Sequence, residues 1–233
     1  DADVKDIELS WIVENMVGKN TQYHRFERSI DLSKQPKVLE IRDMCLPKKG
    51  GGWTLDHVSL DLKKGEVLGV YGLLGAGRSE LFECLMGLHP EHTGDVLYEG
   101  KKLNIKDVAA QIKNGFALVP EDRQSQGLIQ TLDIGKNTAI SSMKDYVKGL
   151  FLDEKAENAA VDEQIKDIHI KVADKRLPIL SLSGGNQQKV VIGKGLLTKP
   201  KILLLDEPSR GIDIGAKTEV FEIIHDLAEK GLS

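Results

Sequence analysis

Residues 180–189 read Leu-Ser-Leu-Ser-Gly-Gly-Asn-Gln-Gln-Lys, and residues 202–207 read Ile-Leu-Leu-Leu-Asp-Glu. The uninterrupted aliphatic run of the second stretch predicts a buried central strand, which ends in Asp206 and Glu207. In the first stretch a serine and two glycines precede a helical segment, which predicts a helix with a serine N-cap. A helix followed closely by a buried strand is typical of α/β folds.

Other elements follow from the same patterns of apolar residues. The patterns predict strands at residues 38–42, 58–62, 67–71, 96–98, 116–119 and 202–205. They predict helices at residues 7–18, 78–88, 135–143, 154–168, 186–197 and 216–230. Three glycines at 50–52 indicate a hairpin loop between the first two strands. Because strands and helices alternate in the second half, we expect a parallel sheet there, covered on both faces.

The composition excludes several classes of protein. The chain has 233 residues, 40% hydrophobic and 29% charged, with a net charge of −4, so it can bury a sizeable core. It contains no block of basic residues that would bind nucleic acid, and we expect no nucleic-acid partner. Cys45 and Cys84 are its two cysteines, too few for a disulfide framework and suited to a reducing compartment. No apolar run approaches the roughly 20 residues that span a bilayer, and no signal-peptide pattern opens the chain. Any membrane role would therefore work through a partner.

A glycine-rich loop lies between the strand expected at 67–71 and the helix expected from residue 78. Residues 72–79 read Gly-Leu-Leu-Gly-Ala-Gly-Arg-Ser. In this context glycines allow backbone N–H groups to converge on phosphate oxygens, and the helix N-terminus adds its dipole. A tight strand-to-helix corner is the alternative interpretation. The candidate phosphate-binding residues are Gly72, Leu74, Gly75, Ala76, Gly77, Arg78, Ser79 and Glu80.

Arg78 stands where the phosphate-binding pattern has lysine. The guanidinium is a planar fork on a bulkier head, whereas the lysine ammonium is a compact point charge. Arg78 can still bind phosphate, but its fit inside the loop is in question. The hydroxyl of the following residue, Ser79, is a candidate ligand for Mg²⁺.

The acids that end the strand at 202–205 are the candidate metal-binding and catalytic residues. Asp206 would hold Mg²⁺ through water, and Glu207 would orient or deprotonate the attacking water. The alternative is a solvated acidic pair that caps the next turn.

Ser183, Gly184 and Gly185 have two interpretations. They are an ordinary helix start, with the serine as N-cap. In the functional interpretation, the same N–H groups and helix dipole meet the γ-phosphate of a nucleotide held by another domain of the same kind.

Taken together, these motifs resemble those of one family. The chain is similar to the second of two tandem cassettes in the ATP-binding subunit of bacterial sugar-import ABC transporters, of the ribose, galactose and xylose type. The resemblance also rests on residues 120–123, 186–189 and 208–217, and it covers residues 37–233. Residues 1–36 resemble the tail of a preceding cassette and a linker.

The resemblance implies an α/β fold, the P-loop NTPase fold of an ABC cassette. Such a cassette has a mostly parallel central sheet, a small antiparallel β subdomain and a helical subdomain, here expected at residues 122–180. It binds ATP and Mg²⁺. In the family a switch histidine lies on the strand after the helix that follows the Asp-Glu pair, and residues 37–233 are expected to lack that strand.

Further site residues are implied only by the resemblance. Asp213 corresponds to an acid that touches the opposing cassette, and Glu121 stands where ordinary cassettes have glutamine. A carboxylate cannot donate a hydrogen bond as an amide does, so the sensing role of that position is in question. Trp53 is the candidate aromatic residue that stacks on adenine, and a core tryptophan beside a hairpin is the alternative.

The implied function is that of the ATPase motor of a monosaccharide importer on the cytoplasmic face of the cell membrane. Its partners would be the first cassette of the same subunit or a second copy, the transmembrane permease subunits and, indirectly, a sugar-binding protein. The signature at 183–185 would complete the partner's ATP site, while the arginine-containing loop would form the weaker site, so the isolated chain would hydrolyse ATP poorly. The alternatives are a soluble tandem-cassette ATPase without a transport role, and a nucleotide-binding half without hydrolysis.

Overall fold

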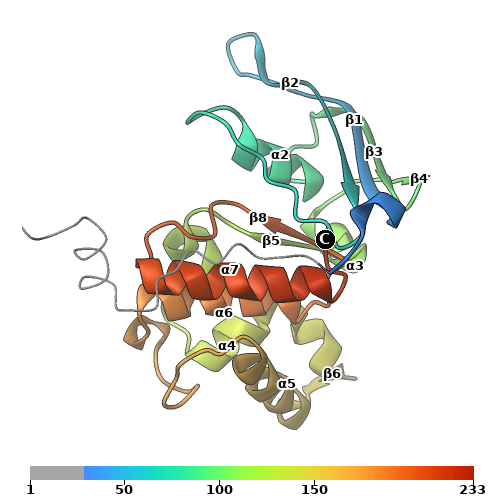
Figure 1. Ribbon diagram of the computed structural model, residues 1–233. Helices are drawn as coiled ribbons and strands as arrows, with labels where there is room; N and C mark the ends of the chain where they lie inside the picture. The colour runs from blue at the N-terminus through green and yellow to red at the C-terminus, as the bar shows by residue number, and fades with distance from the viewer. Residues whose placement is uncertain (1–28) are drawn as a thin grey trace, which may run out of the picture.

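The computed structural model describes residues 29–233. The helix predicted at 7–18 therefore lies outside the described residues. Figure 1 shows an antiparallel sheet with α2 in the upper part of the molecule, and a stack of helices in the lower part. The strands β5 and β8 lie between them.

The upper part is the antiparallel β subdomain expected from the sequence. Its strand order is β2-β1-β3-β4, where the strands are β1 Lys37–Pro47, β2 Trp53–Lys63, β3 Thr93–Tyr98 and β4 Lys101–Lys102. The glycines at 50–52 all have positive φ and connect β1 to β2, so the predicted hairpin is confirmed.

A parallel pair of strands forms the centre of the molecule. Strand β5, Phe116–Val119, pairs with β8, Ile202–Leu205, and both strands have the predicted bounds. Alternate side chains enter two different cores. Phe116, Ile202 and Leu204 join the core shared with β1, β3 and α2, whereas Val119 joins the core under α6 and α7. The pair is therefore covered on both faces, as expected for parallel strands.

Helices α6, Gly184–Leu196, and α7, Ile214–Glu229, lie side by side beneath β8 in Figure 1. Both start about two residues earlier than the apolar pattern predicts, because Ser183 and Asp213 provide the N-caps. Between β5 and α6 the chain forms a largely helical region. Its elements are η3 Arg123–Gly127, α4 Ile134–Ala139, η4 Ile140–Tyr146, β6 Val147–Lys148, β7 Phe151–Leu152, α5 Glu154–Asp167 and η5 Ile179–Ser181. The short α3, Val108–Lys113, precedes β5.

The strand predicted at residues 67–71 is wrong. This segment has no regular secondary structure, and Val67, Leu68 and Val70 are each about two-fifths exposed. The physical reason is that no main-chain hydrogen bond joins it to another segment of the described chain. An apolar run needs a neighbouring strand to satisfy its backbone groups before it can form a sheet.

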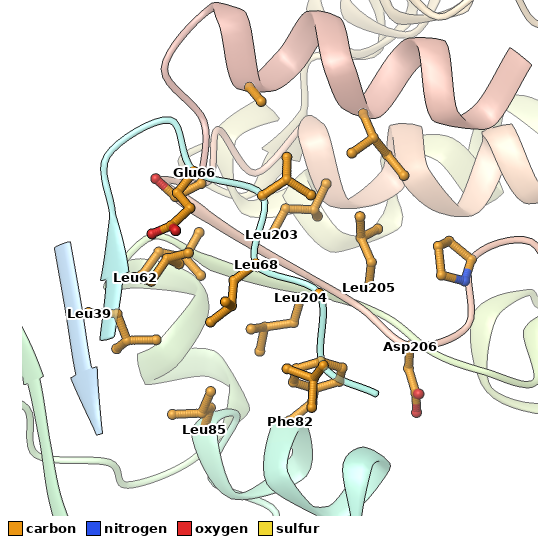
Figure 2. A pocket seen from close by; sticks show the side chains of 18 of the residues that line it. Leu39, Leu62, Glu66, Leu68, Phe82, Leu85, Leu203, Leu204, Leu205 and Asp206 are labelled. Carbon is orange, nitrogen blue, oxygen red and sulfur yellow. The ribbon is translucent and has the colours of Figure 1, made fainter. Parts of the chain in front are cut away.

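An apolar groove separates this segment from β8. It encloses about 330 Å³ and is lined by side chains of β1, β2, α2, β8 and α7. Figure 2 shows Leu68 directed toward Leu204, with Glu66 and Asp206 at opposite ends of the groove. Along this edge β8 is paired only at its start, where Leu203 N–H donates to Ser233 O at 2.8 Å and Ser233 N–H donates to Lys201 O at 3.2 Å.

Candidate nucleotide-binding site

The glycine-rich loop of residues 72–77 lies outside regular secondary structure and leads into α2, Arg78–Leu85. Gly77 is the helix N-cap with φ of 84°, and an added Cβ would lie 2.6 Å from a carbonyl oxygen of β2, so only glycine fits. At Gly75, by contrast, an added Cβ would meet nothing within 4 Å, and Leu74 is 96% exposed. The backbone of the loop is therefore accessible to a ligand.

The side chain of Arg78 turns toward the carboxyl end of β8. Its Nη2 donates to Glu207 Oε1 at 2.6 Å, in an ion pair whose side chains are 25% and 36% exposed. A hydrogen bond between two charged groups is among the stronger polar contacts in proteins, and here it occupies one oxygen of the carboxylate. The contact also brings the glycine-rich loop and the acidic strand end into one site.

The two acids after β8 have different environments. Asp206 is buried, and its N–H donates to Val119 O at 2.9 Å, which extends the parallel pairing by one residue. Glu207 has φ of 43°, in the left-handed region that non-glycine residues seldom adopt, and its carbonyl accepts from Arg210 N–H at 2.9 Å. A solvated acidic pair is thus a wrong description of Asp206, and the sharp turn presents Glu207 to Arg78.

The remaining candidates near the loop are Ser79, Glu80 and Trp53. Ser79 and Glu80 lie in the first turn of α2 and are partly buried. Trp53 starts β2, is 50% exposed and lies edge-on to His57, with 6.3 Å between ring centroids. The core-tryptophan alternative is therefore wrong, and stacking on adenine stays a prediction.

The signature residues form the start of α6. Ser183 Oγ accepts from Asn186 N–H at 3.4 Å and from Asn186 Nδ2 at 3.1 Å, so its role as N-cap is confirmed. The two glycines allow close packing: an added Cβ at Gly184 would lie 3.3 Å from Gly211 O, and one at Gly185 would lie 2.4 Å from Ala216 Cβ. The signature thus lies against the loop that connects β8 to α7.

Two predicted residues have partners that the sequence did not reveal. The carboxylate of Glu121 forms an ion pair with the guanidinium of Arg210. Asp213 is exposed and caps α7 by accepting from Ala216 N–H at 2.9 Å. Nucleotide sensing by Glu121 and contact of Asp213 with an opposing cassette stay predictions.

The candidates therefore fall into two groups. Residues 72–80 lie beside Glu207, whereas residues 183–185 lie beside the loop at 208–216. Within residues 29–233 no hydrogen bond or ion pair joins the glycine-rich loop to the signature.

Sequence reasoning missed two connecting side chains, those of Arg123 and Lys189. Arg123 donates to the carbonyl oxygens of Arg210 and Gly211. Lys189, nearly fully buried in α6, donates to Glu219 Oε2 of α7 at 2.5 Å and to a backbone carbonyl at 2.9 Å. The hydrogen bond from Lys189 holds the pKa of Glu219 below its ordinary value. The Gln-Gln-Lys run at 187–189 was a usable signal, because polar residues on the inner side of a helix need buried partners.

Comparison with known proteins identifies the family. The family model described as ABC transporter matches residues 55–210, more than half of the chain. The chain therefore belongs to the ABC transporter family, as an ATP-binding cassette.

Curated relatives include proteins named for sugar import. The chain is 38% identical to the xylose import ATP-binding protein XylG of Pseudomonas savastanoi pv. phaseolicola over 99% of its length, and 37% identical to the ribose import ATP-binding protein RbsA of Oceanobacillus iheyensis over 99%. It is 39% identical to the galactose/methyl galactoside import ATP-binding protein MglA of Salmonella typhimurium over 98%. The matches span 45%, 45% and 44% of these relatives, so the chain covers less than half of their length.

Solved structures agree on the fold. A nucleotide-free ATP-binding cassette from an ABC transporter superposes with a TM-score of 0.72 at 23% identity, over 84% of this chain and 79% of that one. CbiO1 from Clostridium perfringens gives 0.69 at 23% identity, over 83% and 74%. These likenesses confirm the cassette fold expected from the sequence. No helix among the residues that the structure describes is long and apolar enough to cross a membrane.

Proposed function

We propose that this chain binds ATP with Mg²⁺ at residues 72–79 and hydrolyses it slowly. The observation that carries the proposal is the contact between Arg78 and Glu207, since it joins an open glycine-rich loop to an acidic strand end. Phosphate binding needs main-chain N–H groups that side chains do not cover, and the open space at Gly75 meets that need.

The residues present fit a bound Mg-nucleotide. The hydroxyl of Ser79 and the carboxylate of Asp206 are oxygen donors of the kind that Mg²⁺ prefers, and Mg²⁺ would neutralise phosphate charge. Asp206 is the buried carboxylate at this strand end, where a bound cation would offset the cost of its burial. Trp53 offers an exposed ring face for the adenine base.

Slow hydrolysis follows from the state of the catalytic candidate. Glu207 must accept a hydrogen bond or a proton from the attacking water. In the structure one of its oxygens already accepts from Arg78, so that oxygen is not free to accept from a water molecule. Water activation therefore requires Arg78 to leave Glu207 and turn to the phosphates.

We further propose that Ser183, Gly184 and Gly185 complete the ATP site of a partner cassette. The partner is the first cassette of the same subunit or a second copy of this chain. Support comes from the absence of any hydrogen bond or ion pair between the signature and this chain's own glycine-rich loop within residues 29–233, and from the exposure of Asp213. The first N–H groups of α6 would meet the partner's γ-phosphate.

In the cell, we propose that the chain acts as part of the motor of a monosaccharide importer. The relatives named for xylose, ribose and galactose import support this role. The motor would work at the cytoplasmic face of the membrane, on permease subunits that receive sugar from a binding protein. Closure of two cassettes on ATP and their reopening after hydrolysis would drive the cycle.

One assay separates this role from its two alternatives. ATP turnover is measured for the chain alone, for the chain with its partner cassette, and for both with membrane subunits. Stimulation by membrane subunits supports the importer motor. Full turnover that membrane subunits do not change favours a soluble tandem-cassette ATPase. The absence of hydrolysis at this chain's own site in every mixture favours a nucleotide-binding half.

The groove beside β8 supports one more proposal about the cassette. We propose that it accepts one extended apolar strand, running parallel to β8 and starting beside Ser233. The two hydrogen bonds between Ser233 and β8 already follow the pattern of parallel pairing, and the backbone of residues 67–71, on the other side of the groove, makes no main-chain hydrogen bond within the described chain.

A further inference from the structure

The guanidinium of Arg123 joins two segments that are far apart in sequence. Its Nη1 donates to Arg210 O at 2.8 Å, and its Nη2 donates to Gly211 O at 3.0 Å. Arginine suits this task because its planar fork can donate to two adjacent acceptors at once, which the lysine ammonium does less well. Both acceptors belong to the loop that begins at Glu207.

The same guanidinium lies against the start of the signature helix. A Cβ added at Gly184 would lie 2.9 Å from Arg123 Nη2, so the absence of a side chain there allows the approach. One residue further along η3, Gln124 Nε2 donates to Gln187 Oε1 at 2.6 Å, which joins η3 to the first turn of α6.

A second contact runs between the same two loops. Glu121 forms an ion pair with the side chain of Arg210, whose N–H donates to the carbonyl of Glu207. The segment after β5 is therefore joined to the loop after β8 by two side chains: Arg123 reaches the carbonyls of that loop, and Arg210 reaches back to Glu121. Glu207 and Gly184 lie at the two ends of this arrangement.

The buried position of Arg123 includes one energetically unfavourable feature. Its Nε is buried and has no hydrogen-bond partner among the described residues. An unpaired buried donor is unfavourable, so the hydrogen bonds of Nη1 and Nη2 must be what keeps the side chain in this position.

We propose that Arg123 is a positioning residue that clamps the loop at 207–211 against the N-terminus of α6. Through this clamp the carboxylate of Glu207 and the signature move together, so that nucleotide bound at one site alters the surface offered to the partner cassette. The coupling rests on the proposed function, whereas the clamp itself is independent of it.

The experiment is hydrogen exchange on the 233-residue chain, with and without Mg-ATP. Arg123→Gln removes the fork, and Arg123→Lys keeps the charge but cannot bridge both carbonyls as the fork does. Arg176→Gln is the matched control, since this arginine is 83% exposed and pairs only with the neighbouring Asp174 in the described chain. The amides followed are those of Asn186, Gln187 and Arg210, which are hydrogen-bonded in the structure.

Without nucleotide, we expect Arg123→Gln to speed exchange at these amides about tenfold, as loss of a charge-assisted hydrogen bond predicts. Arg123→Lys should fall between the wild type and Arg123→Gln, and Arg176→Gln should match the wild type. Equal acceleration along the whole chain, or full protection in Arg123→Lys, would overturn the clamp.

With Mg-ATP, the wild type should gain protection both at residues 72–80 and at residues 184–187. Arg123→Gln should keep the first gain and lose the second, and retention of both would overturn the coupling. If the wild type gains no protection at 72–80, the proposed nucleotide site is refuted. The exchange rates of the wild type and the Arg123 variants without nucleotide still show whether Arg123 clamps the loop.

Discussion

At the residue scale, the candidate catalytic residue Glu207 is in contact with Arg78 of the glycine-rich loop. Arg78 has the length and the planar fork to reach Glu207 at 2.6 Å, so one oxygen of the carboxylate is paired. The sequence alone raised the question of whether arginine fits the loop, and the structure shows where its guanidinium goes instead. The sequence could not reveal the contact between Arg78 and Glu207, because the two residues are 129 positions apart.

The first prediction concerns Arg78. We expect the isolated chain to hydrolyse ATP well below about 1 s⁻¹, the low end of ordinary enzymes. Arg78→Lys should raise the single-turnover rate on the order of tenfold, because both oxygens of a freed Glu207 can accept from the attacking water and lysine is a compact phosphate ligand. Quench-flow with radiolabelled ATP measures this, and Arg42→Lys on the exposed face of β1 is the control. An unchanged or lower rate in Arg78→Lys would refute the proposed restraint.

At the element scale, the two strands of the parallel pair and the helices α6 and α7 were predictable, because each has a strong apolar pattern and the helices have clear start signals. Strands β5 and β8 have the predicted bounds, and α6 and α7 begin at side-chain caps. Residues 67–71 were not predictable from their own pattern. Strand formation depends on a neighbour, which a local pattern cannot report.

The groove gives a prediction at this scale. An extension of five alternating valines and isoleucines after Ser233 should enter the groove, pair with β8 and raise Tm by several degrees, because it buries apolar surface. A glycine-serine extension of equal length should leave Tm unchanged. Identical melting of the two extended chains would show that the groove does not accept a strand.

The contact between α6 and α7 predicts a pH dependence. Because the hydrogen bond from Lys189 lowers the pKa of Glu219 below 4.5, the pair stabilises the fold above that pH, and the contribution is lost as the pH falls through the lowered pKa. Glu219→Gln should lower the free energy of unfolding by roughly 2 kcal/mol near neutral pH and by much less in acid. This value already allows for the partial exposure of Glu219 to solvent. Urea unfolding across pH, with Glu222→Gln on the same helix as control, tests this. If the free energies of unfolding of the wild type and Glu219→Gln differed by the same amount at all pH values, the pH dependence would not come from the pair of Lys189 and Glu219.

The signature gives a further prediction. Gly184→Asp should leave ATP affinity at residues 72–79 within a few-fold of the wild type, because the signature lies apart from that loop. In the complete tandem subunit it should abolish hydrolysis, since an added side chain blocks the approach of N–H groups to a γ-phosphate. Ser183→Ala, which removes only the cap, should cost about 1 kcal/mol of stability. Normal hydrolysis by Gly184→Asp with a lowered Tm would make the motif purely structural.

At the scale of the whole molecule, the described chain places two candidate functional surfaces on one cassette. The loop at 72–79 and Glu207 form one, and the signature with Asp213 forms the other. Local motifs predicted both surfaces, since glycines, caps and acids at strand ends carry their chemistry in short stretches. The connections between them, through Arg123, Arg210 and Glu121, were not predictable, because long polar side chains in loops choose partners only after folding.

The central claim is that residues 72–79 bind an adenine nucleotide, and calorimetric titration of Mg-ATP onto the folded chain tests it most directly. The matched variant is Gly75→Asp: the added side chain enters open space, aspartate tolerates φ of 76° better than most residues, and its carboxylate repels phosphate. We predict saturable binding to the wild type, and affinity at least about tenfold weaker in the variant at an unchanged Tm. Absence of binding to folded wild-type chain, or equal affinity in the two proteins, would contradict the account.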